Sequence, residues 1–369
     1  MIYFDNAATT MPKPQVVVDA VSDAINTLGN PSRGIYKSSL DGLRCLMRAR
    51  MAISNYFEMA NPMNVAFTMN ATTALNAAIS SVDGHIVTTA AEHNSVLRPI
   101  YRSGDYSIVE LDDRGRLDLD RLEDKIKPDT KAIVMTHASN FTGNVFDIYG
   151  AAEICKRKNI VLIVDAAQSA GLIPIDIGRL GDCAVCFSGH KSFFGPQGTG
   201  GICIGGDFRI RPLTVGGSGI NSFDKTHPSS MPEVLEAGTQ NVHGVAGLLA
   251  GVEYIGESGR CFDDADSLAR YFADSVKKID MLTLYGDMDA DLRVPVVSLN
   301  HSDMTSDELA FRLWSDYEIA TRAGAHCAPL MHRTFGTEQS GAVRFSFSHF
   351  NTKQEVDKAL DALLEIIEG

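Results

Sequence analysis

The sequence predicts an α/β protein built on a largely parallel sheet, followed by a smaller α+β unit. Three observations lead to this fold class. Between residues 64 and 206, short apolar runs alternate with segments of helical spacing, as in βαβ units. After residue 287 this alternation ends, and a strand, helix, strand, helix pattern follows. The length of 369 residues exceeds the usual size of one domain, which favours two unequal domains.

Two helical segments precede the predicted sheet. Residues 14–29 (PQVVVDAVSDAINTLG) and residues 39–57 (SLDGLRCLMRARMAISNYF) carry apolar residues at helical spacing. Gly29 is placed to end the first helix. We expect both helices to pack around the sheet that follows.

Seven apolar runs supply the predicted strands of the sheet. In chain order from residue 64 to residue 206 they are NVAFTM, HIVTTA, YSIVEL, AIVMTHA, IVLIVDAA, AVCFSG and GGICIGG. Helices are predicted between them at residues 72–81, 94–101, 118–127 and 147–158. We therefore expect a larger domain at residues 15–254, with helices on both faces of its sheet.

The smaller domain is predicted at residues 255–369. Its strands are RVPVVSLN and GAVRFSFSHFN, and its helices are TSDELAFRLWSDY and the carboxy-terminal segment TKQEVDKALDALLEIIEG. We expect residues 1–14 to pack on this smaller domain.

Composition argues against several classes of protein. No stretch of about 18 uncharged apolar residues is present to span a bilayer, and the segment MIYFDNAATTMPKP lacks the regions of a secretory signal. A net charge of −13 disfavours nucleic acid as a partner. The seven cysteines form an odd set without framework spacing, which favours reduced thiols. We therefore expect a cytoplasmic protein that binds neither nucleic acid nor membranes.

Polar residues follow the predicted strands at the sheet edge where ligands bind. Asp165 follows four apolar residues, and its carboxylate could hold a cationic ring nitrogen or a metal; a helix N-cap is an equally good interpretation. Thr72 and Thr73 begin a helix whose free N–H groups and hydroxyls could bind phosphate. On that segment alone, capping by Thr72 or Asn70 is the better interpretation. His93 follows another strand, where its ring could stack on a planar ligand or be structural.

Lys191 is the most informative of these candidate site residues. It follows a strand in SGHKSFFGPQGTG, with His190 before it and glycines behind it. Burial lowers the pKa of a lysine and makes its amine a nucleophile toward an aldehyde; the alternative is a surface lysine whose ammonium reaches solvent. Phosphate donors, a stacking ring, an acid and an amine together are what pyridoxal phosphate requires. The glycines at 195–201 match neither nucleotide-binding fingerprint.

The chain resembles the class V aminotransferase group of fold-type I pyridoxal-phosphate enzymes, and within it the cysteine desulfurases and selenocysteine lyases. The resemblance runs nearly from end to end and rests on YFDNAATT, GNPSRG, TMNATTALN, EHNS, HASNFTGN, VDAAQSAG, SGHKSFFGPQGTG, EAGTQN, RAGAHCAPLMH and RFSFSHFNT. It implies a large domain with a mostly parallel, seven-stranded sheet, pyridoxal 5′-phosphate as the cofactor, and a small amino-acid substrate.

The resemblance also implies roles for individual residues. Lys191 corresponds to the Schiff-base lysine, Asp165 to the partner of the pyridine nitrogen, and His93 to the catalytic histidine that stacks on the ring. Gln168 and Asn140 correspond to residues on the hydroxyl side of the cofactor. The positions that correspond to the phosphate-binding cup are Thr72, Thr73, Ser188 and His190. Thr239 corresponds to a residue that reaches the phosphate of the neighbouring subunit, which implies a homodimer with shared sites.

Two further segments correspond to substrate-binding and sulfur-transfer positions. Arg344 matches the arginine whose planar fork pairs with the substrate α-carboxylate, with Asn140 and Arg322 also placed at the substrate. Cys327 separates the possible reactions, because sulfur abstraction needs a thiol and transamination does not. As cations, Arg322 and His326 are expected to lower the pKa of the Cys327 thiol toward neutrality. The alternative is that Cys327 is a small buried apolar residue.

The reaction implied by the resemblance converts L-cysteine to L-alanine and leaves the sulfur as a persulfide on Cys327, for transfer to a thiol or an acceptor protein. A selenocysteine lyase, or another class V aminotransferase or lyase, is the alternative enzyme. A non-catalytic sulfur carrier is disfavoured because Lys191, Asp165 and Arg344 are all present. His326, Cys327 and His332 fit no familiar zinc spacing, so we expect no metal.

Overall fold

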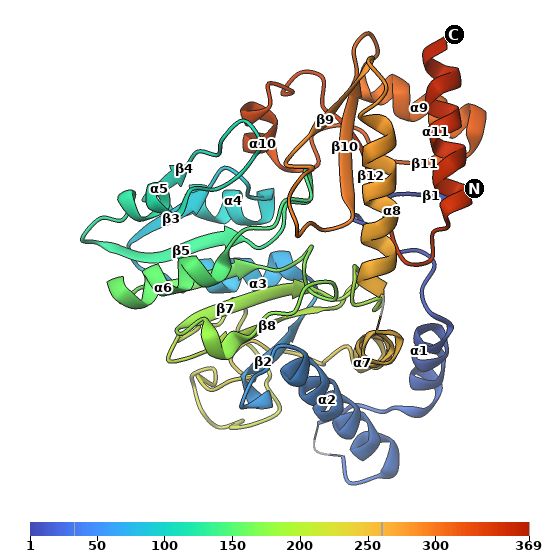
Figure 1. The fold of residues 1–369 in the computed structure, drawn as a ribbon. Coiled ribbons are helices and arrows are strands. Elements are labelled where there is room, and N and C mark those ends of the chain that lie inside the picture. The colour runs from blue at the N-terminus through green and yellow to red at the C-terminus, as the bar shows by residue number, and fades with distance from the viewer. Residues whose placement is uncertain (33, 260, 369) are drawn as a thin grey trace.

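The structure is a computed structural model that describes residues 1–32, 34–259 and 261–368. Arg33 of the GNPSRG segment and Gly369 of the predicted carboxy-terminal helix lie outside the described residues. The larger part of the chain surrounds one seven-stranded sheet, with the strand order β2-β8-β7-β6-β5-β3-β4 (Figure 1). Its strands are β2 (Val65–Thr68), β3 (His85–Thr89), β4 (Tyr106–Val109), β5 (Thr130–Thr136), β6 (Val161–Asp165), β7 (Cys183–Ser188) and β8 (Gly200–Gly205).

The predicted fold class is confirmed. Neighbouring strands from β7 through β6, β5 and β3 to β4 are parallel, and each predicted apolar run became one strand of this sheet. The last of them, β8, runs antiparallel to both of its neighbours, β7 and β2. This reversal follows from the short connection after β7, because a parallel neighbour would need a crossover of a dozen or more residues.

Helices cover both faces of the sheet. On one face lie α3 (Ala71–Ser80) and α4 (Asn94–Ser103). The other face packs against α2 (Lys37–Tyr56), α6 (Ile148–Lys158) and α7 (Val242–Ser258), with α1 (Gln15–Thr27) lying against α7 (Figure 1). The shorter elements of this part are α5 (Leu119–Asp124), η1 (Pro62–Asn64) and η2 (Ile177–Arg179). Helix α7 was not predicted from the sequence.

The remaining chain forms a second layered unit. Its antiparallel sheet has the order β12-β10-β9 and its core contains Phe272, Phe345 and Leu363. The strands are β9 (Leu282–Tyr285), β10 (Val296–His301) and β12 (Val343–Ser346), and the helices are α8 (Cys261–Val276), α9 (Ser306–Tyr317), α10 (Pro329–Thr334) and α11 (Lys353–Glu368). The boundary that we predicted at residue 255 falls inside α7, which continues to Ser258.

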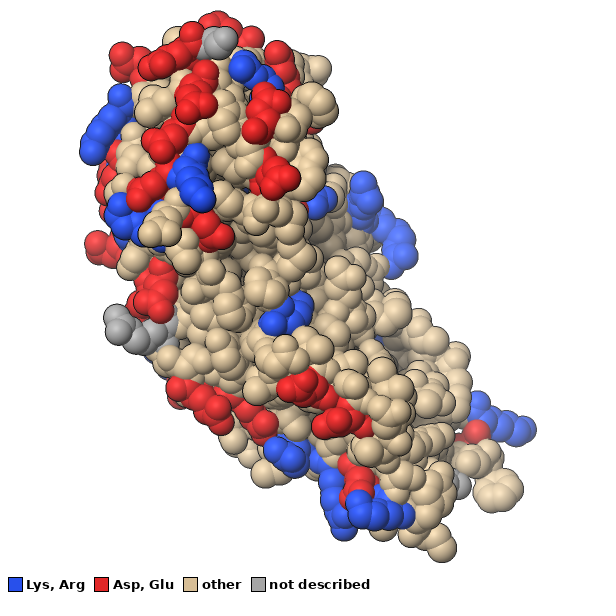
Figure 2. Space-filling view, turned by 90° about the vertical axis from the view of Figure 1, so that its right-hand side faces the viewer, with Lys and Arg blue, Asp and Glu red and all other residues tan. Residues whose placement is uncertain are grey.

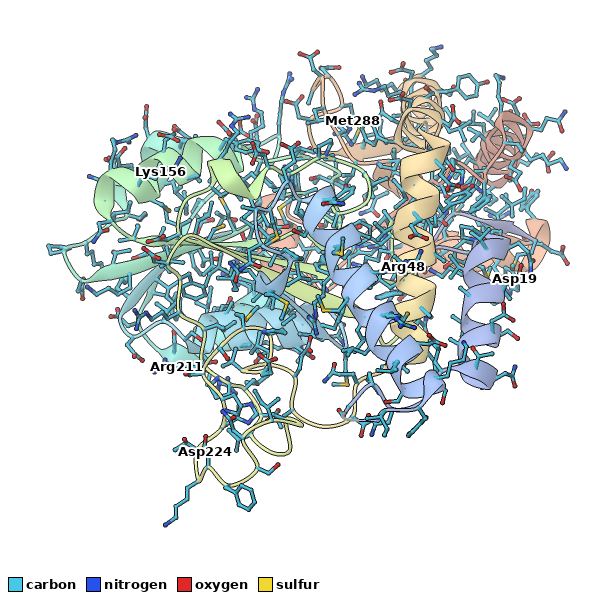
Figure 3. All side chains as sticks on the ribbon, turned by 90° about the horizontal axis from the view of Figure 1, so that it is seen from below. Asp19, Arg48, Lys156, Arg211, Asp224 and Met288 are labelled. Atoms are coloured by element: carbon cyan, nitrogen blue, oxygen red, sulfur yellow. The ribbon has the colours of Figure 1, made fainter. Side chains whose placement is uncertain are left out.

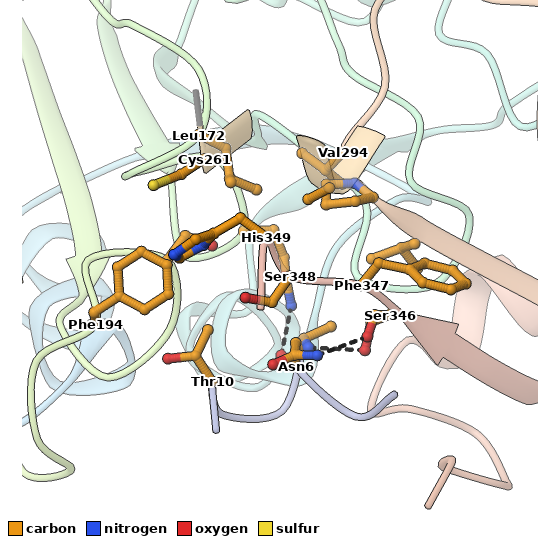
Figure 4. A pocket seen from close by; sticks show the side chains of 16 residues that line it. Asn6, Thr10, Leu172, Phe194, Cys261, Val294, Ser346, Phe347, Ser348 and His349 are labelled. Atoms are coloured by element: carbon orange, nitrogen blue, oxygen red, sulfur yellow. Dashed lines mark hydrogen bonds between the residues drawn. The ribbon is translucent and has the colours of Figure 1, made fainter. Parts of the chain in front are cut away.

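The amino-terminal segment lies against this second unit. Here β1 (Ile2–Tyr3) pairs in parallel with β11 (Ile319–Ala320), and Phe4 is fully buried in the same core as Phe345. Asn6 donates a hydrogen bond from Nδ2 to the Ser346 carbonyl at 3.0 Å (Figure 4). The cavity drawn in Figure 4 has a volume of about 20 Å³, enough for one water molecule. The segment thus closes tightly onto its neighbours.

The surface reflects the acidic composition. In Figure 2 acidic side chains gather over the upper part of the molecule, and the basic side chains on this face are scattered. Among the described helices, none is long and apolar enough to cross a bilayer.

Candidate active site

A cleft of about 230 Å³ opens at the carboxyl edge of the central sheet. The strands β5, β6 and β7 end at Thr136, Asp165 and Ser188, and all three residues line the cleft. This is the edge at which parallel sheets bind ligands. The predicted site residues on its walls are Thr72, His93, Asn140, Asp165, Gln168, Ser188, His190 and Lys191.

Asp165 presents a buried carboxyl group to the cleft. Its Oδ1 accepts a hydrogen bond from the Ala167 N–H at 2.9 Å. Burial raises the pKa of Asp165, although the Ala167 hydrogen bond and the charge of Lys191 both oppose this rise. Residues 167–172 form turns, so the helix N-cap interpretation of Asp165 is wrong.

Lys191 lies on the wall of the cleft and is not a solvated surface lysine. Burial lowers the pKa of its amine to about 8; Asp165 opposes this shift, and the positive charges of Arg344 and Arg322 add to it. The amino-terminal segment holds its backbone, because the Thr10 hydroxyl donates to the Lys191 carbonyl at 2.9 Å. The Lys13 ammonium donates to the preceding carbonyl, of His190, at 2.6 Å.

His93 is the N-cap residue of α4. Its Nδ1 accepts a hydrogen bond from the Ser95 N–H at 3.0 Å, so the neutral ring carries its proton on Nε2. Burial lowers the pKa of His93 to about 4, and the charge of Lys191 adds to this effect. The ring is therefore uncharged near neutral pH. The next residue, Asn94, donates its N–H to the Cys327 carbonyl at 2.7 Å.

The amino terminus of α3 forms one end of the cleft. The Ala71 N–H points to the Ser188 hydroxyl at 3.3 Å, and the exposed Thr72 shares a 2.7 Å hydrogen bond with Ser95. Asn70 caps the helix by accepting from the Thr73 N–H at 3.0 Å and from its hydroxyl at 3.2 Å. Asn70, one of the two residues considered as the cap of this helix, is thus confirmed as the N-cap, and the Thr73 hydroxyl is hydrogen-bonded within this cap.

His190 stands at the same end of the cleft. Its Nδ1 is buried and has no hydrogen-bond partner among the described residues. Burial lowers the pKa of His190 to about 4, so its ring is neutral. A neutral ring nitrogen, hydroxyls and a helix amino terminus form a set of groups that suits an anion such as phosphate.

Arg344 lies behind Asn140 and is only 3% exposed. Its Nη1 donates to the Asn140 carbonyl at 3.0 Å and its Nη2 donates to Asp5 Oδ1 at 2.8 Å. Burial lowers the pKa of Arg344, an effect that Asp5 opposes. The Asn140 amide in turn donates to the His326 carbonyl at 2.7 Å. Asn140 therefore connects the cleft both to Arg344 and to the loop of Cys327.

Cys327 is exposed on the wall of a neighbouring groove of about 450 Å³. This groove shares Thr72, His93 and Ser95 with the cleft, so the thiol lies beside the cleft rather than buried away from it. Cys327 and His326 both have left-handed backbone conformations, with φ of +56° and +49°. Such conformations cost about 1–3 kcal/mol each in residues other than glycine and are found at functional sites.

The prediction that His326 is a cationic neighbour of Cys327 is wrong. Its ring is packed against Phe141 at 5.6 Å and His332 at 5.7 Å, and its Nε2 hydrogen-bonds the Arg322 carbonyl at 3.0 Å. Burial lowers the pKa of His326 to about 3. The ring is therefore neutral and does not supply the positive charge that was expected beside Cys327.

Several residues at the site were missed. Thr136 and Ser95 line the cleft, and Asp5 binds Arg344. Thr136 stands at the carboxyl end of a predicted strand, which is the signal that could have identified it. Asp5 lies within the YFDNAATT segment, but a single sequence does not show that this segment returns to residue 344.

The site and the fold place the chain among known proteins. The sequence profile of the aminotransferase class V family matches residues 2–359, and the chain belongs to this family. The relatives that it matches carry a more specific name. A probable cysteine desulfurase from Pyrococcus abyssi is 32% identical, with 100% of this chain and 95% of the relative covered.

Solved structures agree with this assignment. The structure of a cysteine desulfurase from Thermococcus onnurineus superposes with a TM-score of 0.93 at 31% identity, covering 100% of this chain and 95% of that one. The cysteine desulfurase CsdA from Escherichia coli gives a TM-score of 0.87 at 26% identity, covering 99% and 94%. The resemblance seen in the sequence is thereby confirmed.

Proposed function

We propose that this protein is a pyridoxal-phosphate-dependent cysteine desulfurase that releases L-alanine from L-cysteine and takes the sulfur onto Cys327. One observation carries the proposal: the cleft with Lys191, Asp165 and His93 adjoins the groove that exposes Cys327, and His93 lines both. The names of the relatives support the same reaction. A transaminase would have no use for an exposed thiol at this point.

The groups on the cleft walls fit pyridoxal phosphate. Lys191 would hold its aldehyde and the Asp165 carboxylate its pyridine nitrogen, with the His93 ring against the face of the cofactor and Gln168 at its hydroxyl. Its phosphate would lie at the amino terminus of α3, near Ser188 and His190; the unpartnered Nδ1 of His190 suits this position. When bound, the cofactor supplies an electron sink for the carbanion formed at the substrate Cα.

Individual residues of the chain would then act on different groups of the substrate. Arg344, held by Asn140, would bind the α-carboxylate through its guanidinium. The Lys191 amine, whose pKa burial lowers to about 8, would move the Cα proton. The Cys327 thiolate would attack the substrate sulfur, and the C–S bond would break with its electron pair left on the substrate carbon. That carbon would take up a proton to become the methyl group of alanine, and a persulfide would remain on Cys327. A thiol would collect that sulfur at the exposed groove.

The test uses purified protein with pyridoxal phosphate, L-cysteine and a reducing thiol. We expect alanine and sulfide in equal amounts. The Cys327→Ser variant should keep the visible absorbance band of the bound cofactor but lose alanine formation, because no sulfur acceptor remains. Cys45→Ser, at a partly buried cysteine of α2, is the matched control and should behave as the wild type. Undiminished alanine formation by Cys327→Ser would reject the proposal.

We also propose that the active form is a homodimer in which Thr239 reaches the partner's phosphate site. Thr239 is exposed, and the nearby loop carries exposed apolar side chains, with Phe223 at 103% and Val215 at 68%. Figure 3 shows the loop around Asp224 projecting from the body of the protein. A second copy would remove this apolar surface from water. Phe223→Asp should shift the mass measured by light scattering toward the monomer.

The dimer predicts complementation between two defective chains. Lys191→Ala removes the amine of its own site, and Thr239→Ala weakens only the site of its partner. A mixed dimer of the two variants would contain one site with both groups intact. Its activity should exceed that of either variant alone, whereas equal activity would contradict the sharing of sites. The cytoplasmic location and a protein acceptor for the sulfur stay predictions.

A further inference from the structure

The groove that exposes Cys327 carries positive charge. Its volume is about 450 Å³, and its walls come from the first turns of α3, from α4 and from the Cys327 loop. Among the described residues that line it, none is acidic and two are arginines, Arg98 and Arg102. Because the chain as a whole has a net charge of −13, this basic lining is a local departure from an acidic protein.

Arg98 and Arg102 are both exposed, and neither lies within ion-pair distance of a carboxylate in the described part of the chain. Exposed arginines elsewhere, such as Arg44, Arg48 and Arg211, do pair with an aspartate or a glutamate. The helix dipole favours Arg102, in the last turn of α4, but not Arg98. Like charges four residues apart on a helix repel each other, so an anion in the groove would relieve this repulsion.

Helix α4 fixes the two arginines relative to Cys327. Its first residue, Asn94, donates its N–H to the Cys327 carbonyl at 2.7 Å. Arg98 and Arg102 follow at intervals of four residues, which places them on the same face about 6 Å and 12 Å along the helix from that contact. Helical side chains tilt toward the amino terminus, here the Cys327 end of the groove. The charge of Arg98 also acts on His93, where the groove meets the cleft.

We propose that the groove binds the sulfur acceptor, and that this acceptor is a small thiol with two carboxylates that pair with Arg98 and Arg102 while its sulfur lies at Cys327. The volume of the groove falls in the range of small-molecule sites, about 300–1,000 Å³. The two guanidinium groups supply charge-assisted hydrogen bonds to the carboxylates. The inference rests on the proposed function, because it takes a persulfide on Cys327 as the sulfur donor.

The transfer needs no further reactant. The acceptor thiol loses its proton to solvent, and its thiolate attacks the outer sulfur of the Cys327 persulfide. A new S–S bond forms on the acceptor. The bond between the outer sulfur and Cys327 Sγ breaks, and its electron pair stays on Sγ as the thiolate. The outer sulfur keeps its proton, so the products are an acceptor persulfide and the free Cys327 thiolate.

The test compares two acceptors of the same size: N-acetylcysteinyl-aspartate, with two carboxylates, and its diamide, N-acetylcysteinyl-asparagine amide, with none. The cofactor-loaded protein first receives an equimolar amount of L-cysteine in the absence of other thiols. Mass spectrometry of the intact protein then follows the loss of the extra sulfur atom after either acceptor is added. In the wild type we expect the dicarboxylate to react about ten times faster than the diamide. Comparison of this ratio between variants cancels the difference in intrinsic reactivity between the two thiols.

Arg98→Gln and Arg102→Gln should each lower the ratio about threefold, and together about tenfold, because each removes one exposed ion pair. Raising the ionic strength to about 1 M should lower the wild-type ratio in the same way, since salt screens exposed charges. Arg121→Gln is the matched control: it removes an exposed arginine of α5 that does not line the groove, and it should leave the ratio as in the wild type.

A ratio that stays constant in the double variant would overturn the inference. If the double variant also changed the mass measured by light scattering, the groove would be assigned to a second copy of the chain. A longer acidic peptide with a central cysteine that reacts faster than the dipeptide would also overturn the inference, in favour of a protein acceptor.

Failure of the proposed function is distinguishable, since the wild type would then take no sulfur from L-cysteine. In that event Cys327 is converted to its thiopyridyl disulfide, and the release of the thiopyridone by the same two thiols gives the ratio. A ratio that responds to Arg98→Gln and Arg102→Gln would still support a site for dicarboxylate thiols, and an unresponsive one would reject it.

Discussion

The lowered pKa of Lys191 predicts unusually fast cofactor uptake at neutral pH. An ordinary lysine has a pKa of 10.5, and only about 0.03% of its amines are unprotonated at pH 7. With the pKa of about 8 that burial produces, the unprotonated fraction is about 9%. Because only the neutral amine attacks an aldehyde, the rate at pH 7 should be about 300-fold higher than for an ordinary lysine of equal accessibility.

The assay mixes cofactor-free protein with pyridoxal phosphate and follows the visible absorbance between pH 6 and pH 10. The rate should rise with pH and level off above about 8. Nα-acetyl-lysine in the same buffers reports the pH dependence of the aldehyde itself, and Lys191→Ala should show no uptake. A rate that still climbs tenfold per pH unit at pH 10 would refute the reasoning.

The Asp165→Asn variant tests whether Asp165 raises the pKa of Lys191. The Asp165 carboxylate favours the protonated form of Lys191 and opposes the effect of burial. Removing that negative charge should therefore move the midpoint of the uptake rate below pH 8. A midpoint that moves upward would show that the two groups are not electrostatically coupled.

Three further predictions concern binding and stability. Arg344→Lys should raise the KM for cysteine about ten- to a hundredfold in steady-state assays with a smaller effect on kcat, because an ammonium cannot replace a buried guanidinium fork; an unchanged KM would contradict that role. Phe141→Ala should lower the free energy of unfolding in urea by about 3–5 kcal/mol, since its ring is fully buried against His332 at 4.3 Å; a loss below about 1 kcal/mol would show that Phe141 does not support the Cys327 loop. Glu236→Gln should cost about 3–5 kcal/mol in the same assay, because the positive charge of buried Arg50 loses the carboxylate that compensates it. By contrast, Glu253→Gln, in an exposed ion pair, should cost less than about 1 kcal/mol.

The sheet could be predicted because each strand carries its own signal. The apolar runs from β2 to β8 are short, uninterrupted and separated by helical patterns, so the elements are visible without knowledge of their neighbours. The direction of β8 was not visible, because pairing direction depends on contacts between distant residues. Helix α7 was missed for a local reason: it contains Gly244, Gly247, Gly251 and Gly256, which lower helix propensity and hide its apolar face.

The site residues that could be predicted are those that follow a strand or that match a motif of the family. Asp165 and Lys191 follow strands of one sheet, so their proximity follows from topology. The neutral state of His326 depends on the rings stacked around it, which come from residues 141 and 332. Likewise, Asp5 meets Arg344 only because two chain segments more than 300 residues apart pair in space. Burial and pairing between distant segments arise only in the folded chain, so they cannot be recognised from the local sequence.

The pairing of β1 with β11 has a consequence for the order of events during synthesis. A ribosome makes Ile2 early and its partner Ile319 late, and Asp5 must likewise wait for Arg344. Because domains generally fold as they emerge, the central sheet can form while the amino-terminal strand still lacks its neighbours. The contact between Asp5 and Arg344 therefore cannot form until translation has passed β12, when the protein is nearly finished.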